Sequence, residues 1–408
     1  MRLFYLTTEF PYPPISGGRV RSLAQLKLLA SLPEVTELSV QTLTEEPLPD
    51  SVLGELGAVL PRAQLLPPVF HPIHVKQFPH YLPLIAALRA GRLPYLAGKW
   101  VSPRIALTLR KHLRSPKDVV YVDHLGMGVY FGFIRKLQPG ARVVLEQHNV
   151  ESDFFKQLAD KQTNPVKRLV ATREWHAARR FEERTMRDAN GVVAISDSDA
   201  QAFADMGVRA QVVPQVVTYE ETSWSDNRAP RLVYVGNLGW HPNVEGLDWF
   251  CSEVWPLVRA QVPNAELDIA GSGLGKDAAG RPKVPTAWQA PGVRVVGFTQ
   301  DLERFYQGAV AFLAPILGGS GVRIKVLEAF RGGMPLVTTT AGALGLPIRH
   351  GEHAMVADTK EAYAKSVAEL CQSSALQRRL RQGGYEYLKQ FHSLQAAQGV
   401  MRQALGIS

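Results

Sequence analysis

The residues most suited to chemistry lie in a glycine-rich stretch that follows the apolar run at 309–315. The stretch contains Gly318, Gly319 and Gly321, and helical periodicity begins near Val322. Glycines let a ligand approach the backbone closely, and the free N–H groups at a helix N-terminus attract anions. The sequence therefore predicts a phosphate-binding turn at this point.

Three charged side chains follow within the same predicted helix. Arg323 and Lys325 lie in its first turn, where cations oppose the helix dipole, so their presence favours an anionic ligand over helix stability. Glu328 lies deeper in the helix, and its carboxylate is suited to accepting hydrogen bonds from a ribose diol. The alternative is a simple glycine turn followed by a solvated, charged helix face.

The elements that must position this turn alternate along the chain. Apolar runs predict strands at 2–10, 35–43, 118–125, 141–149 and 191–196, and a second series at 231–238, 265–271, 293–298, 309–315 and 335–340. Helical patterns fill most of the intervals, including a long region at about 151–190, and the tail from about 359 to 405 is nearly all helical. Strands that alternate with helices predict parallel sheets, so the predicted fold class is α/β.

A polar, irregular stretch at 218–230 separates the two series of strands. We place the N-terminal domain at 1–218, the C-terminal domain at 219–390, and a terminal helix at 391–408 with the N-terminal domain as its candidate packing partner. In open α/β sheets, ligands bind beyond the carboxyl ends of the strands. We therefore expect the site in the cleft between the two domains.

The segment VLEAFRGGMPLV (326–337) resembles the nucleotide-sugar site of retaining glycosyltransferases with the two-domain GT-B fold, of the family-4 type. The resemblance covers the whole chain and implies two Rossmann-like, doubly wound domains that face a central cleft. It implies that Glu328 is the ribose-binding carboxylate. The family's first glutamate, which contacts the donor sugar, is replaced here by Ser320, and this departure leaves the donor sugar open.

Two N-terminal segments carry the same resemblance. TEFPYPPISGGRVRS (8–22) is similar to the family's glycine loop, with Gly17 and Gly18 at the positions near the donor diphosphate and the acceptor. EQHNVES (146–152) is similar to the stretch that places a histidine, here His148, against the donor sugar. A proline-rich turn and a structural histidine are the plainer alternatives for these two segments.

The first turn of the C-terminal domain also matches the family. VYVGNLGWHPNVEGLDWF (233–250) resembles it, with Asn237 where many members hold the diphosphate with an arginine. We infer that the basic pair in the glycine-rich stretch supplies the missing charge. A plainer role for Asn243 is to cap the helix expected at 244–260.

The remaining donor contacts implied by the resemblance involve the backbone. Gly297 and Phe298 match the region that reads the nucleobase, and Ser320, Gly321 and Val322 lie where the glycine turn meets the donor. The expected co-substrate is a UDP- or GDP-sugar, with no other cofactor.

The resemblance implies a retaining, hexosyltransferase-like enzyme that works without a metal. No pair of carboxylates with glycosidase spacing can be identified from the sequence. In the family, the leaving diphosphate is thought to help deprotonate the acceptor, so the protein acts by positioning and by stabilising negative charge. His148, Arg323 and Lys325 are the expected catalytic residues.

Two other motifs fit their apparent function poorly. AGSGLGKDAAG (270–280) is glycine-rich, but Lys276 stands at the third glycine position of a dinucleotide site. The run Asp197-Ser198-Asp199 imitates a metal-binding Asp-x-Asp, but it lies between a strand and a helix, where an N-cap is expected. No group of residues has metal-ligand spacing, so no metal site is predicted.

The chain has 408 residues and a net charge of +9, and the excess lies in residues 51–150, which hold 13 basic and 4 acidic residues. Within this region, residues 68–115 interleave aromatic, leucine and basic side chains, a composition that suits contact with an anionic membrane. Amphipathic helices with ordinary solvated charges are the alternative.

The composition also sets the expected compartment. No apolar run is long enough to cross a membrane, and the N-terminus lacks the pattern of a secretory signal. Cys251 and Cys371 are expected to be buried thiols in a reducing environment. We therefore expect a cytoplasmic protein, peripheral on the inner face of the cell membrane, and no nucleic-acid partner, because no recognition motif is found.

The predicted function is transfer of a sugar from a nucleotide sugar to a hydroxyl of a membrane lipid or lipid-linked glycan, in glycolipid or cell-surface polysaccharide synthesis. A sugar-nucleotide epimerase or phosphorylase of the same fold is one alternative. A non-catalytic nucleotide-sugar binder is another, because Ser320 replaces the first glutamate.

Overall fold

The computed structural model describes residues 1–72, 93–225, 229–275, 282–299, 301–318 and 324–407. The chain divides into two compact units: unit 1 is Met1–Val216 with Leu394–Ser408, and unit 2 is Val217–Ser393. The first division therefore falls after residue 216, where 218 was expected, and the last segment begins at 394, where 391 was expected.

Unit 1 contains a parallel sheet of seven strands in the order β4-β2-β1-β6-β7-β8-β9. These strands are β1 (Arg2–Thr7), β2 (Glu37–Gln41), β4 (Ala63–Leu65), β6 (Val119–Asp123), β7 (Arg142–Glu146), β8 (Gly191–Ala194) and β9 (Gln211–Val212). Two short strands, β3 (Leu43–Thr44) and β5 (Val69–Phe70), pair separately. The longer strands match the predicted apolar runs, whereas β4, β5 and β9 are too short to give a clear pattern.

Helices cover both faces of this sheet. They are α1 (Gly17–Ser31), α2 (Asp50–Val59), α4 (Tyr95–Gly98), α5 (Pro103–His112), α6 (Phe131–Leu137), α7 (Glu151–Asp160), α8 (Pro165–Asp188), α9 (Asp197–Asp205) and α16 (Leu394–Leu405), with a 3-10 turn at Leu125–Tyr130. Along β1, Leu3 and Tyr5 belong to one buried apolar cluster, and Phe4 and Leu6 belong to another. The continuous apolar runs of the strands follow from this burial on both faces.

Helix α16 packs within unit 1. Its Ala397, Met401 and Leu405 recur every four residues and lie in the same apolar cluster as Tyr5. Arg402 Nε donates to a carboxylate oxygen of Glu34 at 2.8 Å. The C-terminal segment is therefore part of the core formed by the N-terminal strands.

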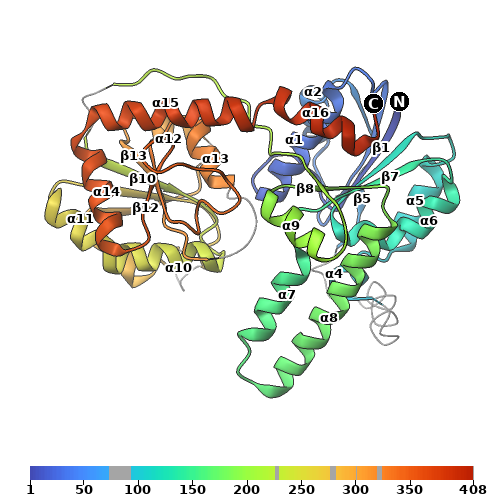
Figure 1. Cartoon of the computed structure of the whole chain (residues 1–408), viewed down its shortest axis with the longest axis horizontal. Coiled ribbons are helices and arrows are strands. Elements are labelled where there is room, and N and C mark those ends of the chain that lie inside the picture. Colours follow the sequence, from blue (N-terminus) through green and yellow to red (C-terminus); the bar gives the residue numbers. More distant parts are fainter. Residues whose placement is uncertain (73–92, 226–228, 276–281, 300, 319–323, 408) are drawn as a thin grey trace. The chain divides into compact units, whose positions relative to one another are not determined.

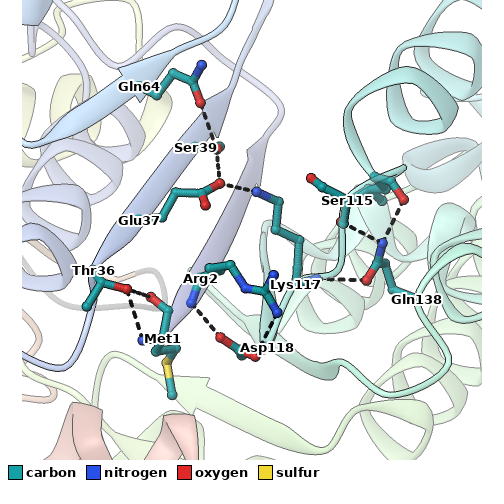
Figure 2. Close-up of polar contacts among 11 residues, drawn as sticks. Met1, Arg2, Thr36, Glu37, Ser39, Gln64, Ser115, Lys117, Asp118 and Gln138 are labelled. Carbon is teal, nitrogen blue, oxygen red and sulfur yellow. Dashed lines mark hydrogen bonds and ion pairs between the residues drawn. The ribbon is translucent and has the colours of Figure 1, made fainter.

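Polar contacts close the amino ends of β1, β2 and β6 (Figure 2). Lys117 forms an ion pair with Glu37, and the amide of Arg2 donates to Asp118 Oδ2 at 2.6 Å. The side-chain oxygen of Gln138 accepts from the Lys117 amide at 2.9 Å, which holds the loop before β6. These polar side chains make structural contacts at the amino edge, and ligands of such sheets bind at the carboxyl edge.

Helices α7 and α8 form a hairpin that extends beyond the sheet of unit 1 (Figure 1). The helical region expected at about 151–190 therefore consists of two helices, separated at 161–164. Asn164 caps α8, its side-chain oxygen accepting from two amides of the first turn at 3.0 and 3.1 Å, and Pro165 is the first helical residue. Proline suits the start of a helix, because its fixed φ is already helical.

Unit 2 contains a parallel sheet of six strands in the order β12-β11-β10-β13-β14-β15. The strands are β10 (Arg231–Val235), β11 (Glu266–Ala270), β12 (Val293–Gly297), β13 (Ala311–Ala314), β14 (Leu336–Thr338) and β15 (Met355–Val356). The helices are α10 (His241–Trp249), a π-helical turn (Phe250–Val254), α11 (Trp255–Gln261), a 3-10 turn (Thr286–Trp288), α12 (Leu302–Tyr306), α13 (Ile324–Arg331), α14 (Lys360–Gln372) and α15 (Ser374–Phe391). Cys251 is buried, Cys371 is half-buried, and both are free thiols.

The strand order reverses once in each sheet, between β1 and β6 in unit 1 and between β10 and β13 in unit 2. Ligands of doubly wound sheets bind beyond the carboxyl ends of the strands at such switch points. The prediction of two doubly wound α/β units with a helical C-terminal region is confirmed. Among the described residues, no helix combines the length and the apolar character needed to cross a bilayer.

Candidate functional site

The predicted glycine loop of unit 1 lies at the start of α1. Gly17 and Gly18 are the first two helical residues, and Ser16 caps the helix, its hydroxyl accepting from the Arg19 amide at 3.3 Å. A Cβ on Gly18 would lie 2.3 Å from Oε1 of Glu9, so any side chain there would displace this carboxylate. The loop after β1 thus brings the free N–H groups of α1 to the carboxyl edge of the sheet.

His148, predicted to contact the donor sugar, follows β7 at the same edge. Its Nε2 lies 2.6 Å from Oδ1 of Asp123, the last residue of β6, and both side chains are buried. Asp123 Oδ2 also accepts from Ser22 Oγ at 2.6 Å and from Tyr5 Oη at 2.8 Å. The carboxylate of Asp123 therefore fixes the ring of His148, as carboxylates commonly orient functional imidazoles.

A second histidine, His124, lies directly against His148. The centroids of the two rings are 3.8 Å apart, and the rings are inclined by 35°. His124 has a φ of 79°, a region that residues other than glycine rarely adopt. Such strain persists where surrounding contacts hold it, often at functional sites. Gly18 and His148 are thus linked through Asp123 and His124, two residues that the sequence analysis did not select.

A second buried carboxylate supports this cluster. Glu146, the last residue of β7, accepts from Arg21 Nε at 2.6 Å and from Tyr121 Oη at 2.7 Å. Arg21 also donates to the carbonyl of Val213 at 2.9 Å. Because Arg21 belongs to α1, these contacts fix the helix, and with it the glycine loop, against the strand ends.

Opposing effects set the protonation of the cluster. Burial alone would raise the pKa of Asp123, but the adjacent His148 and His124 hold it well below its usual range. Burial alone would lower the pKa of His124, but the carboxylates of Asp123 and Glu9 outweigh burial and raise it to about 9. His124 is therefore an imidazolium at neutral pH.

We expect the free energy of unfolding to fall as the pH rises from about 6.5 to about 9. Because the folded pKa of His124 lies above its unfolded value, the stabilisation is complete below the unfolded pKa and is lost as the pH rises through the folded pKa. The loss is at most about 3 kcal/mol. Urea unfolding of the wild type and of His124→Gln across this range measures it. A fall of equal size in both proteins would contradict the assignment.

Asp123, His124 and His148 each offer one donor atom, and these atoms lie within 4.8 Å of one another. Two imidazoles and a carboxylate are a donor set that transition metals accept. However, His148 Nε2 and Asp123 Oδ1 are 2.6 Å apart, a hydrogen-bond distance that already accounts for both atoms. This geometry favours a hydrogen bond between His148 and Asp123 over the coordination of a metal ion.

In unit 2, Lys325 lies in the first turn of α13. Its Nζ donates to Tyr234 Oη at 2.8 Å and to Asn243 Oδ1 at 2.6 Å, and it lies 4.6 Å from the centre of the Tyr234 ring. Tyr234 is buried in β10, and burial raises its pKa, so its hydroxyl is a neutral acceptor. These contacts hold the ammonium of Lys325 at the switch point between β10 and β13.

Asn237, predicted to stand in for a diphosphate-binding arginine, lies exposed in the turn after β10. Its Oδ1 accepts from the Gly239 amide at 2.9 Å, and its carbonyl accepts from Asn243 Nδ2 at 2.8 Å. The role of Asn243 as a helix cap is wrong, because α10 begins earlier, at His241. Asn243 instead bridges this turn to Lys325.

Glu328, the predicted ribose ligand, is half-buried on α13 and forms an ion pair with Arg331, one turn further along. Arg331 Nε lies 3.0 Å from both carboxylate oxygens. Glu303, which is mostly exposed, lies 3.8 Å from another nitrogen of Arg331. The sequence analysis did not anticipate this partner, and a ribose diol at Glu328 would share the carboxylate with it.

Gly297 and Phe298, predicted to lie near the nucleobase, follow one another at the carboxyl end of β12. Gly297 has a φ of 79°, and a Cβ there would meet no atom within 4 Å, so conformation rather than space requires glycine. Phe298 is 57% exposed. An exposed ring beside a strand end is suited to stacking on a base.

Four predicted site residues, Ser320, Gly321, Val322 and Arg323, lie outside the described residues. The described chain ends at Gly318, after β13, and resumes at the start of α13. Of the predicted donor-side residues, Lys325 and Asn237 are joined through Asn243, whereas the contacts described for Glu328 and Gly297 do not connect them to this pair.

The two motifs that fitted poorly have structural roles. After β11, Gly271 has a φ of 155°, and a Cβ there would lie 1.8 Å from the carbonyl oxygen of Gly236, so glycine lets the β11 and β10 turns pack closely. The Asp-x-Asp run opens α9, but the cap is the preceding Ser196, whose hydroxyl accepts from the Asp199 amide at 3.2 Å. Lys276 lies outside the described residues.

Residues 229–373, most of unit 2, match the family model described as Glycosyl transferases group 1. The family match is confined to this segment of unit 2. The matched residues include Asn237, Gly297, Lys325 and Glu328, the described donor-side residues predicted from the sequence.

Solved structures match the chain over nearly its whole length. The chain is similar to Alr3699/HepE from Anabaena in complex with UDP, with a TM-score of 0.67, 12% identity and 100% of each chain covered. It is also similar to S. aureus TarM in complex with UDP and other ligands, with a TM-score of 0.69 and 10% identity over 99% of this chain and 100% of that one. These similarities show the GT-B fold.

A Klebsiella pneumoniae relative, described as an uncharacterized 44.6 kDa protein in the cps region, is 24% identical over 368 residues, which cover 90% of each chain.

Proposed function

We propose that this protein is a group 1 glycosyltransferase, a retaining, hexosyltransferase-like enzyme that uses a UDP- or GDP-sugar and a hydroxyl acceptor. The observation that carries the proposal is the position of Lys325 within the matched domain. Tyr234 and Asn243 hold its ammonium at the switch point of the sheet, beside the start of α13. A cation at that position is suited to a diphosphate. The complex of the similar HepE with UDP supports a uridine nucleotide.

The proposed reaction exchanges one bond at the anomeric carbon. The bond between the sugar carbon and the diphosphate oxygen breaks, and the acceptor oxygen bonds to the same carbon on the same face. The acceptor proton passes to the departing diphosphate. In this proposal Lys325 offsets the charge that grows on the leaving group, and Arg323 is assigned the same role from the sequence alone, so we propose that no metal is needed.

The unit 1 residues have a positioning role in this proposal. The buried Asp123 carboxylate orients His148, which we assign to the donor sugar. The N-terminus of α1, with Gly17 and Gly18, is assigned to the diphosphate and the acceptor hydroxyl. Positioning of this kind is the main contribution of a protein when the co-substrate supplies its own base.

For the acceptor, we propose a membrane lipid or lipid-linked glycan, in glycolipid or cell-surface polysaccharide synthesis. The cps-region description of the Klebsiella relative supports a role in polysaccharide synthesis. We propose a cytoplasmic location, peripheral on the inner face of the membrane. Residues 73–92 of the predicted contact segment 68–115 lie outside the described residues. In the described part, α5 buries Ile105 and Leu109 and exposes a basic face, which agrees with either reading of that segment.

Replacing Glu328 by alanine is expected to weaken the binding of the nucleotide sugar about tenfold, because two charge-assisted hydrogen bonds to the ribose are lost. Calorimetric titration with UDP-glucose and GDP-mannose measures the change. Glu303→Ala is the matched control, since it also removes a carboxylate neighbour of Arg331. Equal affinities of Glu328→Ala and the wild type would count against the ribose assignment.

The stereochemistry of the product tests the proposed reaction. Proton NMR of the purified product is expected to show the same anomeric configuration as the donor. An inverted configuration would contradict the retaining mechanism. Consumption of the donor without any acceptor would favour the epimerase or phosphorylase alternative.

A further inference from the structure

The far end of the α7–α8 hairpin exposes several large apolar side chains to solvent. Val166, Leu169 and Val170 of α8 are 69%, 71% and 64% exposed. They recur at a spacing of three and four residues, so they lie on one face of the helix. On α7, Phe154 and Leu158 are four residues apart and are also exposed.

These side chains do not take part in the packing of unit 1. Within residues 154–173 the two buried positions are small, Ala159 on α7 and Ala171 on α8, and Phe155 packs against the core of the unit. The exposed stripes are therefore a second apolar surface, separate from the one that holds the hairpin together. Clustered exposed apolar residues of this kind mark interaction sites.

The end of the hairpin is also strongly basic. Residues 154–173 contain five basic residues and a single acidic one, Asp160. The basic residues are Lys156, Lys161, Lys167, Arg168 and Arg173, and all five are exposed. Apolar side chains flanked by long basic ones are the pattern of helices that insert into the interface of an anionic bilayer.

The end of the hairpin is also preorganised. Asn164 accepts from the Val166 and Lys167 amides at 3.0 and 3.1 Å, and Pro165 fixes the first turn of α8. The apolar stripe of α8 therefore begins directly after a rigid cap. A surface that is already ordered loses less conformational entropy when it docks.

We propose that the end of the α7–α8 hairpin, residues 154–173, docks on an anionic lipid surface. Its apolar side chains enter the interface, and its lysines and arginines meet the headgroups. A second copy of the chain is a poor occupant, because a symmetric contact would bring the basic clusters together. A nucleic acid would pair with the basic side chains but would leave the five apolar ones in water. The inference rests on the proposed membrane-borne acceptor.

Co-sedimentation of the full chain with vesicles tests the docking surface. The probes are vesicles of equimolar phosphatidylglycerol and phosphatidylcholine, and vesicles of phosphatidylcholine alone. We expect binding to the anionic vesicles, and at least about tenfold weaker binding both for Lys167→Glu/Arg168→Glu and for Leu169→Ser/Val170→Ser. Arg378→Glu/Arg379→Glu, an exposed pair on α15 with the same change of charge, is the matched control and should bind like the wild type.

Several outcomes would overturn the proposal. These are unchanged binding of both hairpin variants, a loss confined to Arg110→Glu/Lys111→Glu on α5, or a change of oligomeric mass in the hairpin variants by light scattering. Among the described residues, no hydrogen bond, ion pair or ring contact joins residues 154–173 to a proposed site residue, so turnover with a detergent-soluble acceptor should stay unchanged in the variants. Retained transfer without vesicle docking would reject the docking surface alone. Absent transfer in the wild type would reject the proposed function.

Discussion

Replacing Lys325 by alanine is expected to lower kcat about 100-fold to 1000-fold. The ammonium lies at the switch point of the sheet in unit 2, and the loss of one preorganised charge donor to a leaving group has an effect of this size. The variant should still fold. It leaves Tyr234 without one donor, which costs about 1–3 kcal/mol, less than the stability of a typical domain. Initial rates at saturating donor, with circular dichroism as a check of folding, measure the effect.

A matched control separates catalysis from a general change of charge. Lys365 on α14 is largely exposed and lies near Glu369, and its replacement by alanine removes the same charge from the same unit. Lys365→Ala should keep the wild-type rate. A folded Lys325→Ala protein with a wild-type rate would show that this ammonium does not act on the leaving group.

Replacing His148 by glutamine is expected to lower kcat about 100-fold while the affinity for the nucleotide alone stays the same. The ring of His148 is held by the Asp123 carboxylate at 2.6 Å, so its position relative to a bound sugar is fixed. Loss of a correctly placed positioning group commonly costs this factor. Turnover assays combined with calorimetric titration of UDP measure the two quantities.

His112, a half-buried histidine at the end of α5, provides the control for His148. His112→Gln should retain full activity. Asp123→Asn should resemble His148→Gln in turnover, because an amide does not hold the His148 ring as the Asp123 carboxylate does. If His148→Gln is as active as the wild type, the histidine is structural, as the plainer reading of the sequence had it.

The fold could be predicted from the sequence because the strands are buried on both faces. β1, β6, β7, β10 and β13 are nearly continuous apolar runs, and their patterns are clear without any partner information. The edge strands β4, β9 and β15 have two or three residues, too few for a pattern. The break between α7 and α8 had a local signal, Asn164 followed by Pro165, which cap and start a helix.

The candidate site was predictable where local sequence carries the chemistry. Gly17 and Gly18 open a helix, His148 follows a strand, and Lys325 follows a glycine-rich stretch of sequence. Asp123 and His124 were missed because their importance depends on the pairing of β6 with β7, which places Asp123 beside Glu146. A pair of chemically active residues at the end of a central strand was the signal that could have found them.

The role of Tyr234 could not be predicted from the local sequence. Within β10 it reads as one more apolar strand residue, and it is indeed buried. Its hydroxyl becomes relevant only because α13, which lies about ninety residues later in the chain, brings Lys325 within 2.8 Å of it. Arg331 differs, because it lies three residues after Glu328 on the same helix, so the spacing of this ion pair was present in the local sequence.

The most direct test of the account is a transfer assay with the purified full chain, a panel of UDP- and GDP-sugars, and a lipid extract as the source of acceptors. Mass spectrometry of the lipid fraction is expected to show a product heavier by one sugar residue with at least one donor. The amount formed should fall about 100-fold or more with Lys325→Ala. If nucleotide sugars bind to the protein but no donor is consumed and no product forms, the protein is a nucleotide-sugar binder and the proposed transfer is wrong.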